Sequence, residues 1–178
     1  MRPQTLWLLA AAAGAAGLAW WYFTHQSSGT SDDAVEGVVN TIKDAVAPRG
    51  VRNNNPGNLR ISSNAWQGKV TPNTDGTFEQ FDTMANGVRA LAVTLTNYQR
   101  LHGLNTVRDL ITRWSATDQA AYVANVASAL GVDPDAPIDV NDPATLTALV
   151  NAIITQENGV VGALLVSRQD VAIGVALA

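Results

Sequence analysis

The amino-acid sequence predicts a mainly α-helical domain that follows an N-terminal transmembrane helix. One small β-hairpin makes the predicted fold class of this domain α+β. Three observations support this fold class. A run of 21 residues from Gln4 to Thr24 carries no charge, four stretches between residues 83 and 159 place apolar residues at helical spacing, and Asp75-Gly76 separates two short extended segments. With 178 residues, the chain has room for one compact domain and appendages but not for two full domains.

The composition excludes several classes of protein. Charged residues make up only 15% of the chain and the formal net charge is −4, so we expect no basic face that holds nucleic acid. The absence of cysteine excludes disulfide scaffolds and cysteine-based zinc or thiol chemistry, and two histidines leave little material for a metal site. We therefore expect no metal, no cofactor and no nucleic-acid partner.

Residues 1–25 are predicted to form a membrane anchor. At 1.5 Å per residue, the uncharged segment is long enough to cross a hydrocarbon core of roughly 30 Å. Trp7 at one end, and Trp20, Trp21 and Tyr22 at the other, are typical of the aromatic residues found at membrane interfaces. Two alternatives stay open: a cleaved secretory signal, or a helix buried in protein.

Residues 26–48 are predicted to form a linker and a stalk helix. The polar segment through Ser31 is rich in Ser and Gly, which is typical of flexible linkers. Acidic residues then open a helix, and Pro48 ends it. Its apolar residues fall on one stripe: Val35, Val38, Val39, Ile42 and Val46.

Residues 49–159 are predicted to form the folded domain. Its first part, through Phe81, is loop-rich, with short β segments expected around residues 59–61 and 77–81. Four helices follow, each with a capping residue at its start. The first helix runs from Thr83 to Gly103, and the second is capped by Asn105 or Thr106. The third opens at Thr117 with Asp118 and closes at Gly131. The fourth is capped by Asn141 or Asp142, begins with Pro143 and runs to about Asn158, before Gly159.

Residues 160–178 form an apolar C-terminal tail in this prediction. Ser167-x-x-Asp170 is a possible capping box within it. The tail has three possible roles: packing on the domain, contacting lipid, or binding a neighbouring protein.

Glu157 is the strongest candidate for chemistry. At about 100° per residue, it lies roughly 20° from Leu146 and Val150 on the helical wheel. We expect burial at the end of this apolar stripe to raise the pKa of the carboxyl group, as a general acid working near neutral pH requires. Glycosidases use such a group to protonate the oxygen that leaves a sugar ring. The alternative is structural: Glu157 reaches solvent or pairs with Arg60 or Arg89.

The other two glutamates are expected to be structural. Glu79 lies between aromatic residues in the segment Phe78–Phe81, which predicts the exposed side of a half-buried strand. Glu36 is expected to cap the stalk helix.

The segment from Arg52 to Arg60 is predicted to be a turn, because its asparagines and glycine tolerate a left-handed backbone. Asparagine amides also pair with the hydroxyl and N-acetyl groups of sugars, since each offers both a donor and an acceptor. Trp66 and Trp114 have flat faces on which sugar rings stack, although each is more often part of a core.

Six blocks of this sequence carry a resemblance; in order, they are RGVRNNNPGNLR, Trp66-Gln-Gly, FEQFDTMANGVRAL, LNTVRDLITRWS, AAYVANVASALGV and AIITQENG. Together these blocks resemble a family of bacteriophage virion proteins that are described as structural proteins or as lytic transglycosylase-like, peptidoglycan-degrading proteins. The blocks cover residues 49–159. The resemblance implies a phage particle associated with a membrane, with other virion proteins as possible partners.

AIITQENG is also similar to the helix of soluble lytic transglycosylases that ends in a catalytic glutamate, with Asn158 here in the usual Ser position. The segment NPGNLR resembles the stretch that follows the catalytic glutamate in lysozyme-like glucosaminidases. In those families the glutamate helix comes first, and here it comes last. The two similarities therefore imply a lysozyme-like domain, possibly circularly permuted.

The resemblance implies peptidoglycan as the substrate and Glu157 as the catalytic residue, first an acid and then a base. It gives a substrate-binding role to eight residues: Asn54, Asn55, Asn58, Arg60, Gln80, Tyr98, Trp66 and Trp114. In a lytic transglycosylase one acidic residue suffices, whereas a hydrolytic muramidase would need a partner such as Asp82 or Asp118. The rival expectations are a non-catalytic structural protein of the virion, and a bacterial or prophage envelope protein that remodels the wall.

Overall fold

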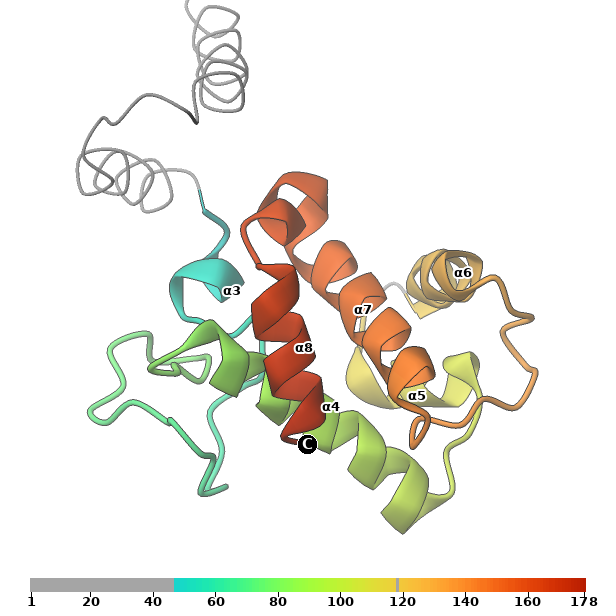
Figure 1. Ribbon diagram of the computed structural model, residues 1–178, viewed down its shortest axis with the longest axis horizontal. Coiled ribbons are helices and arrows are strands. Elements are labelled where there is room, and N and C mark those ends of the chain that lie inside the picture. The colour runs from blue at the N-terminus through green and yellow to red at the C-terminus, as the bar shows by residue number, and fades with distance from the viewer. Residues whose placement is uncertain (1–46, 118) are drawn as a thin grey trace, which may run out of the picture. The chain divides into compact units, whose positions relative to one another are not determined.

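The computed structural model describes residues 47–117 and 119–178. The predicted anchor, and the linker and stalk helix as far as residue 46, lie outside the described residues. The helices, in chain order, are α3 (Arg49–Arg52), α4 (Met84–His102), α5 (Val107–Trp114), α6 (Gln119–Leu130), α7 (Pro143–Leu164) and α8 (Arg168–Ala176) (Figure 1). The described part of the chain is mainly helical, as the sequence predicts.

Four of these helices begin where the sequence predicts, because a side chain before each helix satisfies a free backbone N–H group. The capping residues are Thr83, Thr106, Asp142 and Ser167, and each side chain accepts a hydrogen bond from the amide three residues later. Gly103 ends α4 at φ 66°, in the left-handed region that favours glycine. These boundaries depend on local chemistry alone.

Helix α4 lies at the centre of the core, in contact with α5, α7 and α8. Its residues Val88, Leu91 and Leu95 are fully buried. Helix α8 packs along α4 (Figure 1), and the two backbones come close at Gly174, where an added Cβ would lie 2.6 Å from the Cβ of Val88. The C-terminal segment therefore packs on the domain, which was one of its three expected roles.

The loop between α3 and α4 takes the place of the predicted hairpin. Antiparallel bridges join Arg60 to Phe78 and Lys69 to Phe81, but neither extends into a strand among the described residues. The two predicted extended segments therefore pair only at Arg60 and Phe78, and the second bridge brings in Lys69, which lies outside both segments. Side-chain hydrogen bonds hold the rest of the loop together.

The expected exposure of Glu79 was wrong, because its side chain is fully buried. Its Oε1 atom accepts hydrogen bonds from Lys69 Nζ (2.9 Å), the Ser62 amide (2.9 Å) and Ser62 Oγ (3.1 Å). Strand alternation predicted an outward side chain, but the loop folds over this position and supplies a cation and two donors. Glu79 therefore stabilises the loop through buried hydrogen bonds and an ion pair with Lys69.

Helix α7 changes direction at Gly159, whose φ and ψ of 67° and 170° lie outside the helical region. Helical structure resumes beyond it as far as Leu164, so the predicted stop at Gly159 is a break within the element. In residues 47–117 and 119–178, no helix has the length and apolar character needed to span a membrane.

Candidate functional site

Glu157 lies near the end of the first part of α7, two residues before Gly159. Its half-buried carboxylate accepts hydrogen bonds from three different segments. Asn58 Nδ2 donates to Oε2 (2.9 Å), while Tyr122 Oη (2.9 Å) and Trp114 Nε1 (3.2 Å) donate to Oε1. The Asn-rich turn, α5 and α6 together therefore fix the orientation of this carboxylate.

Tyr122 is the donor to Glu157 that comes from α6. Burial, and the negative charge of Glu157 beside it, raise the pKa of the Tyr122 hydroxyl above its ordinary value of 10.0. The hydroxyl group therefore keeps its proton throughout the physiological pH range and remains a hydrogen-bond donor to the carboxylate.

The Asn-rich turn (residues 53–58) brings Asn58 to Glu157. Asn54 and Asn58 have φ values of 50° and 52°, in the left-handed region that asparagine tolerates better than most residues. Asn55 is fully buried, and its Nδ2 atom donates to the carbonyl oxygens of Leu59 and Glu79, both at 2.9 Å. Asn55 thus stabilises the turn from within, whereas Asn58 contacts the carboxylate of Glu157.

Asn158 fastens this turn to α7. Its buried Nδ2 atom donates to the carbonyl oxygen of Pro56 (2.7 Å) and to that of Ile154 one helical turn earlier (2.9 Å). Because Asn158 follows Glu157 directly, the same turn of helix carries the carboxylate and fixes the segment that contacts it.

An open cleft of about 420 Å³ lies over the Glu157 carboxylate. A volume in this range suits a small ligand or part of a chain of sugars. Polar, aromatic and cationic side chains share its surface. The lining residues are Gly57, Asn58, Leu59, Arg60, Phe78, Tyr98, Trp114, Ser115, Ala116, Thr117 and Glu157.

The structure brings five of the nine predicted site residues together at this cleft: Asn58, Arg60, Tyr98, Trp114 and Glu157. The other four lie elsewhere. Asn54 donates to the carbonyl oxygen of Phe81 (3.0 Å), Asn55 is buried, Gln80 bonds to Asn53 (3.2 Å) and to the Thr74 amide (2.8 Å), and Trp66 is not among the lining residues. Because the amides of Asn54, Asn55 and Gln80 bond within the chain's own loops, they have few groups left for a ligand, and these three residues and Trp66 lie outside the cleft.

Two residues of the site were missed from the sequence. Tyr122 was not among the candidates, although a buried tyrosine hydroxyl usually needs a polar partner, which is the signal that could have identified it. Asn158 was noted only as a departure from the Ser of other families. A buried asparagine beside a candidate acid likewise needs hydrogen-bond partners, and the carbonyl oxygens of the facing turn supply one of them.

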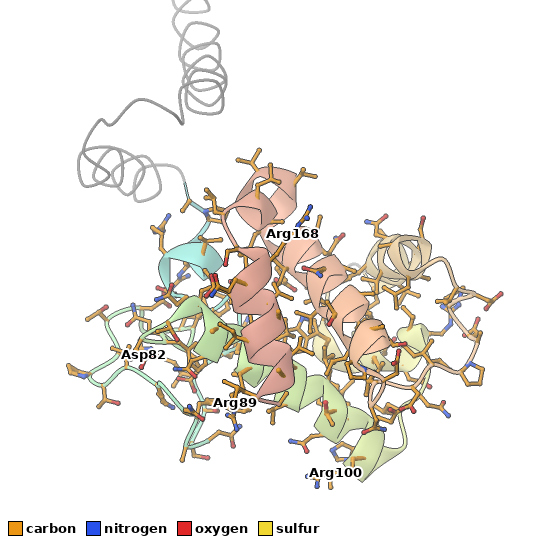
Figure 2. All side chains as sticks on the ribbon, viewed as in Figure 1. Asp82, Arg89, Arg100 and Arg168 are labelled. Carbon is orange, nitrogen blue, oxygen red and sulfur yellow. The ribbon has the colours of Figure 1, made fainter. Side chains whose placement is uncertain are left out.

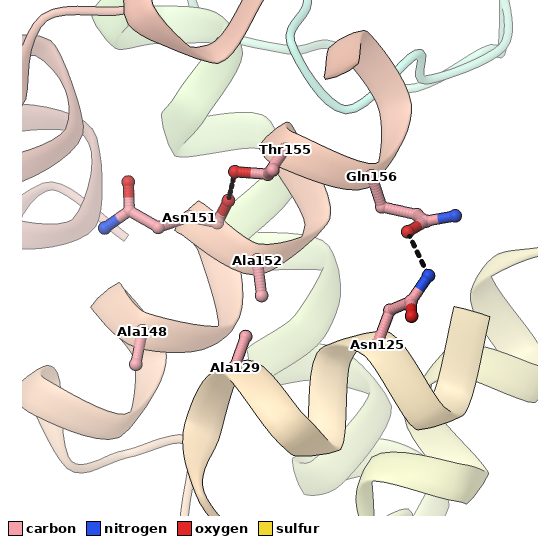
Figure 3. A pocket seen from close by; sticks show the side chains of 7 residues that line it. All are labelled: Asn125, Ala129, Ala148, Asn151, Ala152, Thr155 and Gln156. Atoms are coloured by element: carbon pink, nitrogen blue, oxygen red, sulfur yellow. Dashed lines mark hydrogen bonds between the residues drawn. The ribbon is translucent and has the colours of Figure 1, made fainter. Parts of the chain in front are cut away.

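A second pocket, of about 320 Å³, lies between α6 and α7 (Figure 3). Three alanines face it, and amides line its rim. Asn125 Nδ2 donates to Gln156 Oε1 (3.0 Å), and Thr155 donates to the carbonyl oxygen of Asn151 (2.9 Å). None of the described residues that line it is titratable.

No group of three or more His, Asp or Glu side chains converges as metal ligands would within the part of the chain that the structure describes. Asp82, one of the two carboxylates considered as a partner for Glu157, is exposed on the segment before α4 (Figure 2) and bonds to Asn86 Nδ2 (2.7 Å). The other, Asp118, lies outside the described residues.

The fold and the site thus define a small helical domain with one acidic side chain at the base of an open cleft. No family model matches the chain. Over 119 residues it is 36% identical to Protein P5 of Pseudoalteromonas phage PM2, and the aligned part covers 64% of this chain and 72% of P5. The chain belongs to the family of this phage protein. The phage part of the resemblance is therefore confirmed.

Proposed function

We propose that this chain is a component of a phage particle and that its domain cleaves the glycan strands of peptidoglycan. The observation that carries the proposal is the Glu157 carboxylate, which lies at an open cleft, is oriented by three donors and has amide and aromatic side chains around it. This arrangement suits acid and base catalysis on a sugar polymer, which needs a positioned carboxyl group and surfaces for flat rings and hydroxyl groups.

The proposed reaction is of the lytic transglycosylase type. Glu157, protonated, gives its proton to the glycosidic oxygen, and the bond from that oxygen to the anomeric carbon of the muramyl residue breaks. Glu157, now ionised, accepts the proton of the 6-hydroxyl group of the same muramyl residue, whose oxygen bonds to the anomeric carbon and forms a 1,6-anhydro ring. One carboxyl group is used twice and no water is consumed. Glu157 is the only acidic residue among the described lining residues, which favours this route over a two-carboxylate hydrolysis.

The donors around Glu157 have separate roles in this proposal. Asn58 and Tyr122 hold the two carboxylate oxygens, so the proton is delivered from a fixed position. The indole of Trp114 donates to the same carboxylate and also lines the cleft, where its ring can contact a sugar. Tyr98 lines the same cleft and is placed to stabilise the positive charge that develops on the sugar ring.

We also propose that residues 4–24 hold the protein in a membrane, either inside the virion or in the host envelope. The support is the sequence: 21 uncharged residues with aromatic residues towards both ends. There the enzyme would assist genome entry or lysis. The intact mass of the protein from particles tests this placement, because a mature chain that begins near Trp20 would contradict an anchor.

A non-catalytic structural role in the virion is the second candidate. One observation favours it: both oxygens of Glu157 already accept hydrogen bonds from the protein itself, as they would in a purely structural network. In that case the cleft binds the cell wall or another coat protein without cleaving it.

The deciding experiment is a zymogram of the full-length chain, in detergent, on purified peptidoglycan. The wild type is expected to clear the gel and Glu157→Gln is expected to lose activity by at least about a hundredfold, since acid catalysis by one positioned group contributes about 10²–10⁴-fold. Asp109→Asn is the matched control, because it changes an exposed carboxylate on α5 that lies outside the cleft.

Each outcome separates the candidates. Clearing by both the wild type and Glu157→Gln would remove Glu157 from its catalytic role, and clearing by neither would favour the structural candidate. Mass spectrometry of the released fragments distinguishes anhydro-muramyl ends, expected from a transglycosylase, from the reducing ends left by a hydrolase.

A further inference from the structure

Three arginines in the described part of the chain, Arg60, Arg113 and Arg168, make no side-chain hydrogen bond or ion pair with another described residue. The other arginines donate to carboxylates, carbonyl oxygens or an amide. Arg60 lines the cleft, and the guanidinium of Arg113 lies 5.6 Å from the ring centre of Tyr98, which also lines it. One of these three arginines therefore lines the cleft of Glu157, and a second contacts the ring of a lining residue.

Arg60 is held in place without using its donors. Its guanidinium lies 5.7 Å from the ring centre of Phe78, a second lining residue, within the range of a cation–π interaction. The guanidinium of Arg49 lies 4.7 Å from the same ring centre and also binds Asp75, which helps to keep the ring in position. The five N–H donors of Arg60 thus remain available to a ligand.

Glu157 does not use these cations. The sequence left open a pairing of Glu157 with Arg60, but the hydrogen bonds of this carboxylate within the described residues come from an amide, an indole and a hydroxyl group, all neutral. The chain as a whole carries a net charge of −4, so a free guanidinium group in the lining of this cleft and a second one against its Tyr98 are not a consequence of general basicity. They leave the cleft able to bind an anion as well as a sugar.

We propose that Arg60 binds a carboxylate carried by the glycan, so that Arg60 distinguishes acidic muramyl glycans from neutral polymers of N-acetylglucosamine. The planar guanidinium donates two parallel hydrogen bonds to one carboxylate, which a neutral sugar cannot reproduce. The inference rests on the proposed function in taking the ligand to be a glycan. The carboxylate has two possible sources: the lactyl group of muramic acid when no peptide is attached, or the peptide itself.

The test is calorimetric titration of the full-length chain in detergent, in the Glu157→Gln background, so that the ligands are not consumed. Three tetrasaccharides are compared: a chitin fragment with no carboxylate, a peptide-free muramyl glycan with free lactyl groups, and a muramyl glycan that carries stem peptides. We expect at least one of the acidic ligands to bind about tenfold more tightly than the chitin fragment, and the one preferred identifies the source of the carboxylate.

Adding Arg60→Gln is expected to abolish this preference while leaving the affinity for the chitin fragment unchanged. Arg168→Gln is the matched control, because it removes the third uncommitted arginine, at the start of α8 (Figure 2), and is expected to change nothing. Arg60 is exposed, so we expect its variant to fold, and an unchanged melting temperature would verify this.

Equal affinity for all three ligands, no affinity for any of them, or a preference that survives Arg60→Gln would overturn the inference. A chain that prefers acidic glycans through Arg60 but clears no peptidoglycan would support the inference while contradicting the proposed function. The two failures are therefore distinguishable.

Discussion

Gly87 is the residue at which helix α4 and the Asn-rich turn come closest. A Cβ built on Gly87 would lie 1.7 Å from the carbonyl oxygen of Asn54 and 3.1 Å from Cδ of Pro56. Real Cβ atoms are essentially never found within 3.0 Å of such a neighbour, so a methyl group would force the two backbones apart by about 1 Å. We predict that Gly87→Ala is strongly destabilising.

Two opposing effects determine the magnitude. Replacing glycine by alanine inside a helix stabilises that helix by about 1 kcal/mol. Inserting a group into a packed contact costs about 1–3 kcal/mol, and more when backbone atoms must move. Since the clashing atoms are backbone atoms, which cannot rotate away, we expect a net loss of about 2 kcal/mol or more in the free energy of unfolding.

Urea denaturation of the full-length chain in detergent measures this change. Ala85→Gly is the matched control on the same helix, with an expected loss of about 1 kcal/mol from helix propensity. A Gly87→Ala variant as stable as the wild type, or more stable, would refute the reasoning, because helix propensity would then outweigh the close approach.

Two further predictions concern ion pairs of the loop. Lys69→Met leaves the charge of the buried Glu79 without its cation, so the free energy of unfolding is expected to fall by about 3–5 kcal/mol in urea denaturation; a loss below about 1 kcal/mol would contradict the internal ion pair. The hydrogen bond from Arg49 holds the pKa of Asp75 below its ordinary value of 3.8, so the stabilising contribution of Asp75 is complete above that value and is lost as the pH falls through the folded-state pKa. Melting temperatures between about pH 5 and pH 2 should therefore fall more steeply for the wild type than for Asp75→Asn, and parallel curves would argue against this linkage.

Local signals in the sequence predict most of the helix boundaries. Thr106 and Asp142 cap their helices with their own side chains, and Gly103 ends α4 with its own backbone freedom, so each boundary depends on a few adjacent residues. The short helix α3 was not predicted. Its four residues have no room for an apolar repeat, and it is stabilised by contacts with α7, more than 90 residues later in the chain.

The candidate site was predictable only in part, because several of its contacts also join residues far apart in the chain. The position of Glu157 at the end of an apolar stripe is a property of one helix, which helical periodicity predicts. The burial of Asn55 and Glu79 depends on partners across the loop, such as Leu59 and Lys69, and no pattern within one element contains that information. Residue type identified the amides, but only the fold showed that Asn55 is engaged within the loop and that Asn58 contacts Glu157.

The hydrogen bond between Asn58 and Glu157 joins residues 99 positions apart, one from the beginning of the folded domain and one from near its end. A nascent chain still missing its final helices has no acidic group opposite the Asn-rich turn. Under the proposed function, cleavage of cell wall would endanger the cell that makes the protein, and the contact between Asn58 and Glu157 cannot form until the chain has been synthesised beyond Glu157.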